Sequence, residues 1–214
     1  MRPGRCPPAG RDPGCGTRLR ADAGGAGFGR LRPAPGRAAL RRRPDPGLAA
    51  DLAVALAVEL CSWRLNLAAD LARAGLDDLT RPLDWLTRAA TRFTPAAAAA
   101  ADCPLALHRA GESAVLPRRV WRAQLATFFP TLEEARLALI DRHRPRLRID
   151  DHLRALGATS VEEIELGALC HQLRKALDRR EAARLEILAR LRNRLAHRQP
   201  GAPEACLSLL AGST

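Results

Sequence analysis

The chain has 214 residues, of which 47% are hydrophobic, and a formal net charge of +12. This length and hydrophobic content suffice for one ordinary domain with extensions, and they exclude a chain that is disordered throughout. Lys175 is the one lysine, so the positive charge is nearly all arginine. Such a composition is typical of a GC-rich gene, and the distribution of the arginines is therefore more informative than their number.

Residues 1–47 differ in composition from the rest of the chain. They contain 11 Arg and 3 Asp, a net charge of +8, with 10 of the 16 Gly and 8 of the 16 Pro. Because so few apolar residues cannot offset the entropy of ordering, we expect this segment to be disordered. It is either a basic arm that adds salt-dependent affinity for RNA or a leader without function, and its composition favours the second interpretation.

An export signal is the first alternative that the sequence raises, because three arginines at 41–43 precede an apolar stretch over 48–60. Asp51 interrupts this stretch and Glu59 comes near its end, so neither a secretory signal nor a membrane-spanning helix is favoured. The six cysteines form no C-x-x-C pair and have no metal-ligand spacing with the five histidines. We therefore expect a cytoplasmic protein with reduced thiols, without a metal, a cofactor or a membrane span.

From Leu48 onward the apolar residues recur at helical spacing and no stretch alternates over a strand's length, which predicts an all-α helical bundle. Asp45-Pro46 resembles a helix start and Gly75 a stop, so one long helix is expected over about 47–74. A second helix is expected from Thr80 to about Thr94.

A run of alanines and a proline affect the helices predicted in the middle of the chain. The alanine run at 96–101 is a short helix or filler, and propensity favours helix. A third helix is expected over 120–129, ended by Pro130, because the residue before a proline avoids the α conformation.

The second half contains two capping-box patterns, Thr131 to Glu134 and Ser160 to Glu163, each of which predicts a helix start. The last long helix is expected over 181–198, closed by Pro200-Gly201. We divide the chain into a leader (1–47), a helical region of unassigned role (48–112), a helical domain (113–200) and a C-terminal tail (201–214).

The last predicted helix has two distinct faces. Leucines at 185, 188, 191 and 195 form an apolar stripe that we expect to lie in the core. Arg192 lies close to this stripe, where a guanidinium needs a carboxylate or an anionic ligand, and Glu165 is the expected partner. At about 100° per residue, the opposite side of the helix holds Glu186, Arg190, Asn193, Arg194 and His197.

The residues Arg192-Asn-Arg-Leu-Ala-His197 resemble the HEPN motif, an Arg and a polar residue followed by His after four to six intervening positions. Arg-to-His spacing alone is common in this arginine-rich chain, and we treat Arg146 with His152 as a chance match. The match at Arg192 is more specific because asparagine occurs only at Asn66 and Asn193. The resemblance covers about residues 116–200.

The resemblance implies a HEPN-like helical fold and a metal-independent endoribonuclease, in a toxin or defence system. His197 would be the general base that accepts a proton from a ribose 2′-hydroxyl, and Arg192 would stabilise charge at the phosphate. Asn193 would orient the imidazole or the substrate. The expected product is a 2′,3′-cyclic phosphate. The family's cleft between two protomers implies a homodimer with RNA as substrate, and an antitoxin or NTPase partner is compatible with it. Further RNA-binding candidates are Arg190, Arg194 and Arg198.

The motif also has structural interpretations. Arg192 could form a structural ion pair, and His197 a helix C-cap. The tryptophans could stack on bases, but core packing is favoured. The arginines at 118–119 and 142–148 could bind phosphates or form a solvated surface.

The alternative function is a non-catalytic HEPN-like interaction or nucleotide-binding module, and the third possible function is that of a helical scaffold. Arg198 follows the histidine where many relatives have a small residue.

Overall fold

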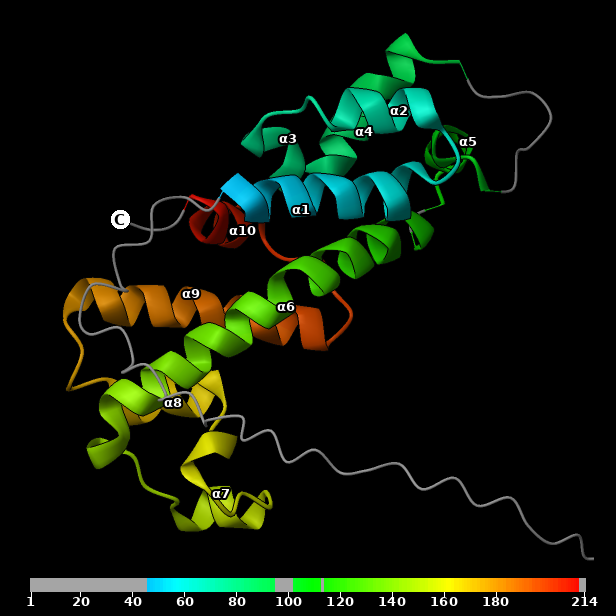
Figure 1. Cartoon of the computed structure of the whole chain (residues 1–214). Coiled ribbons are helices and arrows are strands. Elements are labelled where there is room, and N and C mark those ends of the chain that lie inside the picture. The colour runs from blue at the N-terminus through cyan, green and yellow to red at the C-terminus, as the bar shows by residue number, and fades with distance from the viewer. Residues whose placement is uncertain (1–45, 95–101, 113, 212–214) are drawn as a thin grey trace, which may run out of the picture. The chain divides into compact units, whose positions relative to one another are not determined.

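The computed structural model describes residues 46–94, 102–112 and 114–211. These residues are helical wherever they have regular secondary structure, with no strand among them (Figure 1), so the predicted all-α class is confirmed. No helix within the described ranges is long and apolar enough to cross a membrane. The predicted leader, apart from its last two residues, and the alanine run at 96–101 lie outside the described residues.

The α-helices of the described part follow one another with short connections. A π-helical turn over Ala57–Cys61 follows the first helix, and 3-10 turns cover Arg144–Arg146 and Val161–Glu163. The α-helices are α1 (Pro46–Leu56), α2 (Leu65–Leu71), α3 (Leu76–Thr80), α4 (Pro82–Arg92), α5 (Pro104–Arg109), α6 (Val115–His143), α7 (Asp151–Ala155), α8 (Leu166–Leu173), α9 (Arg179–Ala196) and α10 (Pro203–Leu210).

Helix α6 is the element around which the others pack. It contacts α1, α4, α5, α8 and α9, and Figure 1 shows it passing between α1 and α9. The core is built mostly of leucine, with Trp85 and Phe128 as its largest buried side chains. Each fully buried leucine or phenylalanine contributes about 1.5–3 kcal/mol. Residues from 48–112 and from 113–200 therefore share one hydrophobic core.

The single helix predicted over 47–74 is wrong. After α1 the chain takes a π-helical turn, Ser62 has a φ of 54°, and α2 begins only at Leu65. The guanidinium of Arg64, which is 8% exposed, donates from Nη2 to the carbonyl of Thr94 at 2.9 Å. The hydrogen bond from the buried Arg64 to this distant carbonyl stabilises the break between α1 and α2. Helical periodicity in the sequence cannot reveal such a contact. Trp63 lies in the break and is 45% exposed, so core packing does not apply to it.

The predicted stop before Pro130 is also wrong, because α6 continues through this proline. A proline inside a helix removes one hydrogen bond and costs about 3 kcal/mol. Phe128 and Leu132 on either side of it are both fully buried, so core packing offsets this cost. The predicted capping box at Thr131 is not formed, since Thr131 lies in the helix interior.

The second predicted capping box is replaced by a different set of bonds. The carboxylate of Glu163 accepts from the backbone N–H of Thr159 at 2.6 Å and from its hydroxyl at 3.1 Å, while Ser160 makes no capping bond. Helix α8 consequently begins at Leu166. The region predicted as a C-terminal tail contains α10, which packs against α3 and α9.

Gly201 connects α9 to α10 where there is no room for a side chain. A Cβ atom here would lie 2.5 Å from Cδ1 of Leu191 and 2.7 Å from Sγ of Cys206. We expect Gly201→Ala to lower the free energy of unfolding by about 1–3 kcal/mol, because the buried neighbours must shift. Urea denaturation measures this change.

The control is Gly167→Ala in α8, where an added Cβ would meet nothing within 4 Å. Alanine is the better helix former, so this variant is expected to be as stable as the wild type or more stable by up to about 1 kcal/mol. Equal destabilisation in both variants would contradict the close approach at Gly201.

Candidate functional site

Helix α9 carries the motif and is fixed at its start by a capping box. The carboxylate of Asp178 accepts from the backbone N–H groups of Arg180 and Glu181 at 2.8 Å each, and the carboxylate of Glu181 accepts from the backbone N–H of Asp178 at 3.4 Å. The predicted stripe of leucines is confirmed, because all four of its side chains are buried. The polar face of α9 is therefore held in a fixed direction by the core beneath it.

Arg192 forms the ion pair that its place on the helical wheel suggested. Its Nη2 lies 2.6 Å from Oε1 of Glu165, the residue that immediately precedes α8. The arginine side chain is 25% exposed and the glutamate side chain 54%. The Nε of Arg192 is buried and has no hydrogen-bond partner among the described residues, so this guanidinium still has an unused donor.

The chain turns sharply after α9. The backbone N–H of Arg198 donates to the carbonyl of Leu195 at 3.2 Å, and that of Gln199 donates to the carbonyl of Arg194 at 2.9 Å. This is the Schellman arrangement, with His197 as the C-cap and Arg198 at the position that usually holds glycine. Arg198 accordingly has a φ of 58°, in the left-handed region that non-glycine residues seldom occupy.

Contacts from α6 hold this turn in place. The indole Nε1 of Trp121 donates to the carbonyl of Leu195 at 2.7 Å. The backbone N–H of Gly201 donates at 2.8 Å to Oε1 of Gln124, a side chain that is almost completely buried. Trp121 was considered in the sequence only as a core or base-stacking residue and Gln124 not at all, because nothing in a single sequence pairs residues more than 70 positions apart.

The other residues of the motif are open to solvent. Asn193, Arg194, His197 and Arg190 are all exposed, as the helical wheel predicts for the polar face, and Arg198 in the turn after α9 is exposed as well. Arg194 donates from Nε to the carbonyl of Pro200 at 2.7 Å. Within the described part of the chain, no hydrogen bond or ion pair involves the side chains of the other four.

No hydrogen bond among the described residues joins the side chains of Arg192 and His197, and Arg192 is paired with Glu165 instead. Five residues of α-helix separate Arg192 from His197 by about 140° around the helix axis and about 7.5 Å along it. Arg192 points to Glu165 beside α8, whereas His197 lies at the C-terminal end of α9 with Arg194 and Arg198. A single chain therefore presents its imidazole and its motif guanidinium on different sides.

Two hollows in the described surface lie near the site without containing the histidine. One, of about 210 Å³, is lined by residues that include Arg81, Gln124 and Gly201. The other, of about 230 Å³, is lined by Glu163 and Glu165 among others. Neither is lined by Arg192 or His197.

Two of the remaining sequence candidates, Arg119 and Arg144, are held in structural contacts. Nη2 of Arg119 lies 2.6 Å from Oδ1 of Asp102, and the arginine is 9% exposed, so it is not a phosphate ligand. Arg144 binds Glu162 at 2.5 Å, and this hydrogen bond lowers the pKa of the Glu162 carboxyl.

The buried cysteines are unsuited to nucleophilic chemistry. Burial raises the pKa of the Cys61 and Cys206 thiols to about 12, so both are protonated at neutral pH. The described residues contain no group of three or more His, Cys, Asp or Glu side chains placed to hold a metal ion.

No family model, curated protein or solved structure matches this chain. The resemblance to the HEPN family therefore rests on the six residues from Arg192 to His197.

The left-handed turn at Arg198 gives a direct test of the geometry. Arg198→Gly and Arg198→Ala remove the same charge, but only alanine keeps a Cβ in the left-handed region. We expect the glycine variant to be more stable than the alanine variant by about 1 kcal/mol, measured as the free energy of unfolding in urea.

Arg190 provides the matched control, because it is an exposed arginine in the interior of the same helix. There the order should reverse, with Arg190→Gly less stable than Arg190→Ala by about 1 kcal/mol. If alanine were the more stable substitution at Arg198 as well, Arg198 would not adopt the left-handed conformation.

Proposed function

We propose that the C-terminal end of α9 is the active site of a metal-independent endoribonuclease. This proposal rests on the difference in burial between the residues of the motif. Leu195 is buried, whereas Asn193 and His197, the polar residues that must meet a substrate, are exposed at a helix end fixed by α6. The exposed Arg194 and Arg198 beside His197 supply positive charge for a phosphate.

In the proposed reaction, His197 accepts the proton of a ribose 2′-hydroxyl. The 2′-oxygen forms a bond to the adjacent phosphorus, and the bond from phosphorus to the 5′-oxygen breaks. The leaving 5′-oxygen takes a proton from water, giving a 2′,3′-cyclic phosphate and a 5′-hydroxyl, and His197 returns its proton to the solvent. Arg192 binds the phosphate oxygens and stabilises the charge that develops on them, and Asn193 orients the imidazole or the substrate.

The separation of Arg192 from His197 within one helix supports a site shared by two copies of the chain. A homodimer can place the guanidinium of one protomer beside the imidazole of its partner, which α9 alone cannot do. This arrangement agrees with the cleft that the HEPN resemblance implies. The proposal includes a cytoplasmic toxin or defence role, in which an antitoxin or an NTPase is a further partner.

A second function is favoured by one contact. Glu165 already neutralises Arg192 at 2.6 Å, as expected for a structural ion pair in a non-catalytic interaction or nucleotide-binding module. A nuclease requires phosphate to compete with this carboxylate.

The activity is tested by incubating end-labelled single-stranded RNA with the purified protein in EDTA. We expect cleavage to 2′,3′-cyclic phosphate ends, no cleavage of the corresponding DNA, and a loss of at least about 10²-fold in His197→Ala and in Arg192→Ala. His152→Ala is the control, since His152 is an exposed histidine on α7. Equal background in the wild type and all variants would favour the non-catalytic module.

The shared site is tested by mixing the two inactive variants. A mixed dimer of His197→Ala with Arg192→Ala has one intact site, formed by the His197 of one protomer and the Arg192 of its partner. Because half of randomly exchanged dimers are mixed and each has one of two sites intact, roughly a quarter of the wild-type rate should return. No recovery after verified subunit exchange would contradict a site shared between protomers.

A further inference from the structure

Two helical segments that meet at the candidate site carry arginine and no acidic residue. Residues 114–132 include three arginines, residues 187–203 include four, and neither stretch has an Asp or Glu. The first lies in α6, the second covers the end of α9 and the turn that follows it, and the two helices contact each other. The hydrogen bond from Trp121 to the carbonyl of Leu195 fixes the meeting point at 2.7 Å.

Three of these seven arginines are neutralised by acids from elsewhere in the chain. Arg119 pairs with Asp102 at 2.6 Å, Arg122 with Glu59 at 2.7 Å, and Arg192 with Glu165 at 2.6 Å. The other four form no ion pair with any described residue and are exposed. We call these four the α6–α9 basic surface: Arg118, Arg190, Arg194 and Arg198.

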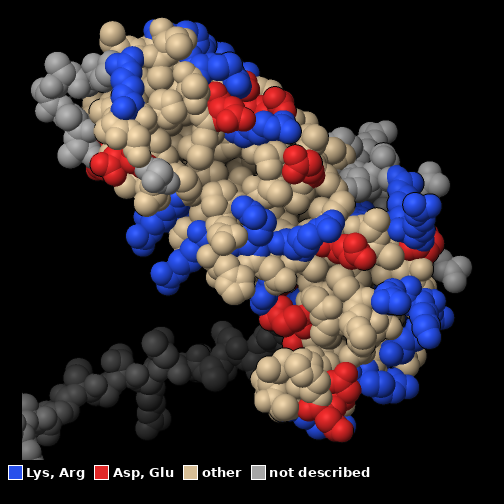
Figure 2. All heavy atoms as spheres, turned by 180° about the vertical axis from the view of Figure 1, so that it is seen from behind, with Lys and Arg blue, Asp and Glu red and all other residues tan. Residues whose placement is uncertain are grey.

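The position of Arg118 extends this surface beyond α9. Arg118 is one helical turn before Trp121, and residues three apart lie on neighbouring parts of a helix face. The indole of Trp121 in turn donates to the carbonyl of Leu195, which is two residues before His197. Figure 2 shows arginine and lysine side chains across the middle of one face of the body, with acidic side chains on both sides of them.

A cluster of cations without carboxylate partners is the electrostatic signature of a site for a polyanion. We propose that the phosphate backbone of a single-stranded RNA runs from the end of α9 onto α6, and that Arg118 binds one of its phosphates. The choice of a single strand rests on the proposed function, because 2′-hydroxyl attack in line with the 5′-oxygen requires a flexible, unpaired nucleotide.

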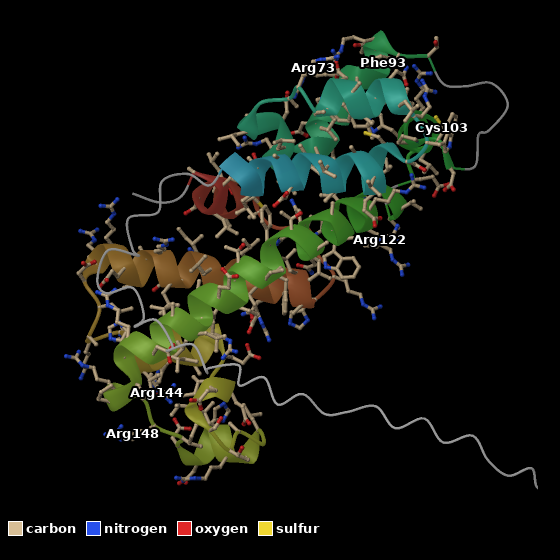
Figure 3. All side chains as sticks on the ribbon, in the orientation of Figure 1. Arg73, Phe93, Cys103, Arg122, Arg144 and Arg148 are labelled. Carbon is tan, nitrogen blue, oxygen red and sulfur yellow. The ribbon has the colours of Figure 1, made fainter. Side chains whose placement is uncertain are left out.

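Glu59 limits the charge of this surface. Figure 3 labels Arg122 on the N-terminal part of α6, and its guanidinium is held by Glu59 from the π-helical turn. The side chain of Arg122 is still 52% exposed. Removing the carboxylate would therefore leave a fifth exposed cation next to Trp121, and RNA affinity should rise.

The test measures binding of a fluorescent single-stranded RNA by anisotropy as the salt concentration is varied. The full-length chain carries His197→Ala throughout, so that the RNA stays intact. Each phosphate contact contributes about 0.7 to the slope of log affinity against log salt for single strands. We expect Arg118→Ala to reduce the slope by about 0.7 and the affinity about fivefold at 0.1 M salt.

The control is Arg180→Ala, which removes an exposed arginine at the opposite end of α9 and should leave both quantities nearly unchanged. Glu59→Gln should steepen the slope by about 0.7. The arginines of residues 1–47 are present in every variant, so differences in slope report on the body of the chain.

Several outcomes would overturn the inference. Arg118→Ala and Arg180→Ala could have equal effects, Glu59→Gln could leave the slope unchanged, or duplex RNA could bind as tightly as the single strand with the same dependence on Arg118. The proposed nuclease is judged separately, by cleavage with the His197-containing protein. A loss of binding on Arg118→Ala without any cleavage by the wild type would support the surface and reject the enzyme.

Discussion

The last turn of a helix leaves backbone carbonyls without helical donors, and how α9 satisfies them determines the geometry of the candidate site. The carbonyl of Leu195 receives two donors, the indole of Trp121 from α6 and the backbone N–H of Arg198. The first bond joins the motif helix to the central helix of the described bundle, and the second turns the chain sharply. The direction of His197 is thus set by a tertiary contact as well as by the helix.

Two local departures from relaxed geometry occur within the motif and immediately after it. Arg198 has a left-handed backbone without being glycine, and the Nε of Arg192 is buried without a partner. Each lowers the free energy of unfolding by about 1–3 kcal/mol, and such features persist only where the packed surroundings hold them in place. These two departures lie on either side of His197.

The regular features of the sequence predicted the structure well, and the exceptions share a cause. The leucine stripe of α9 and the pairing of Arg192 with Glu165 followed from helical periodicity and from the cost of an unpaired buried charge. The path of α6 through Pro130 did not, because core packing on both sides of the proline overrides a local preference. The contacts of Trp121 and Gln124 were missed for a related reason, since their bonds to α9 and its following turn link residues far apart in sequence. The function of the motif was inferred from resemblance, and so was its proposed placement across two protomers.

The turn after α9 also has a consequence for the order in which the protein is made. Gln124 accepts from Gly201, and α10 packs against α3 and α9, so residues made after the motif complete its support. A ribosome adds roughly 5–20 residues per second, and the exit of α10 follows that of His197. Until α10 has been made and has packed, the turn that holds His197 therefore lacks part of its support, and the described geometry of the motif is acquired only after the residues that follow it.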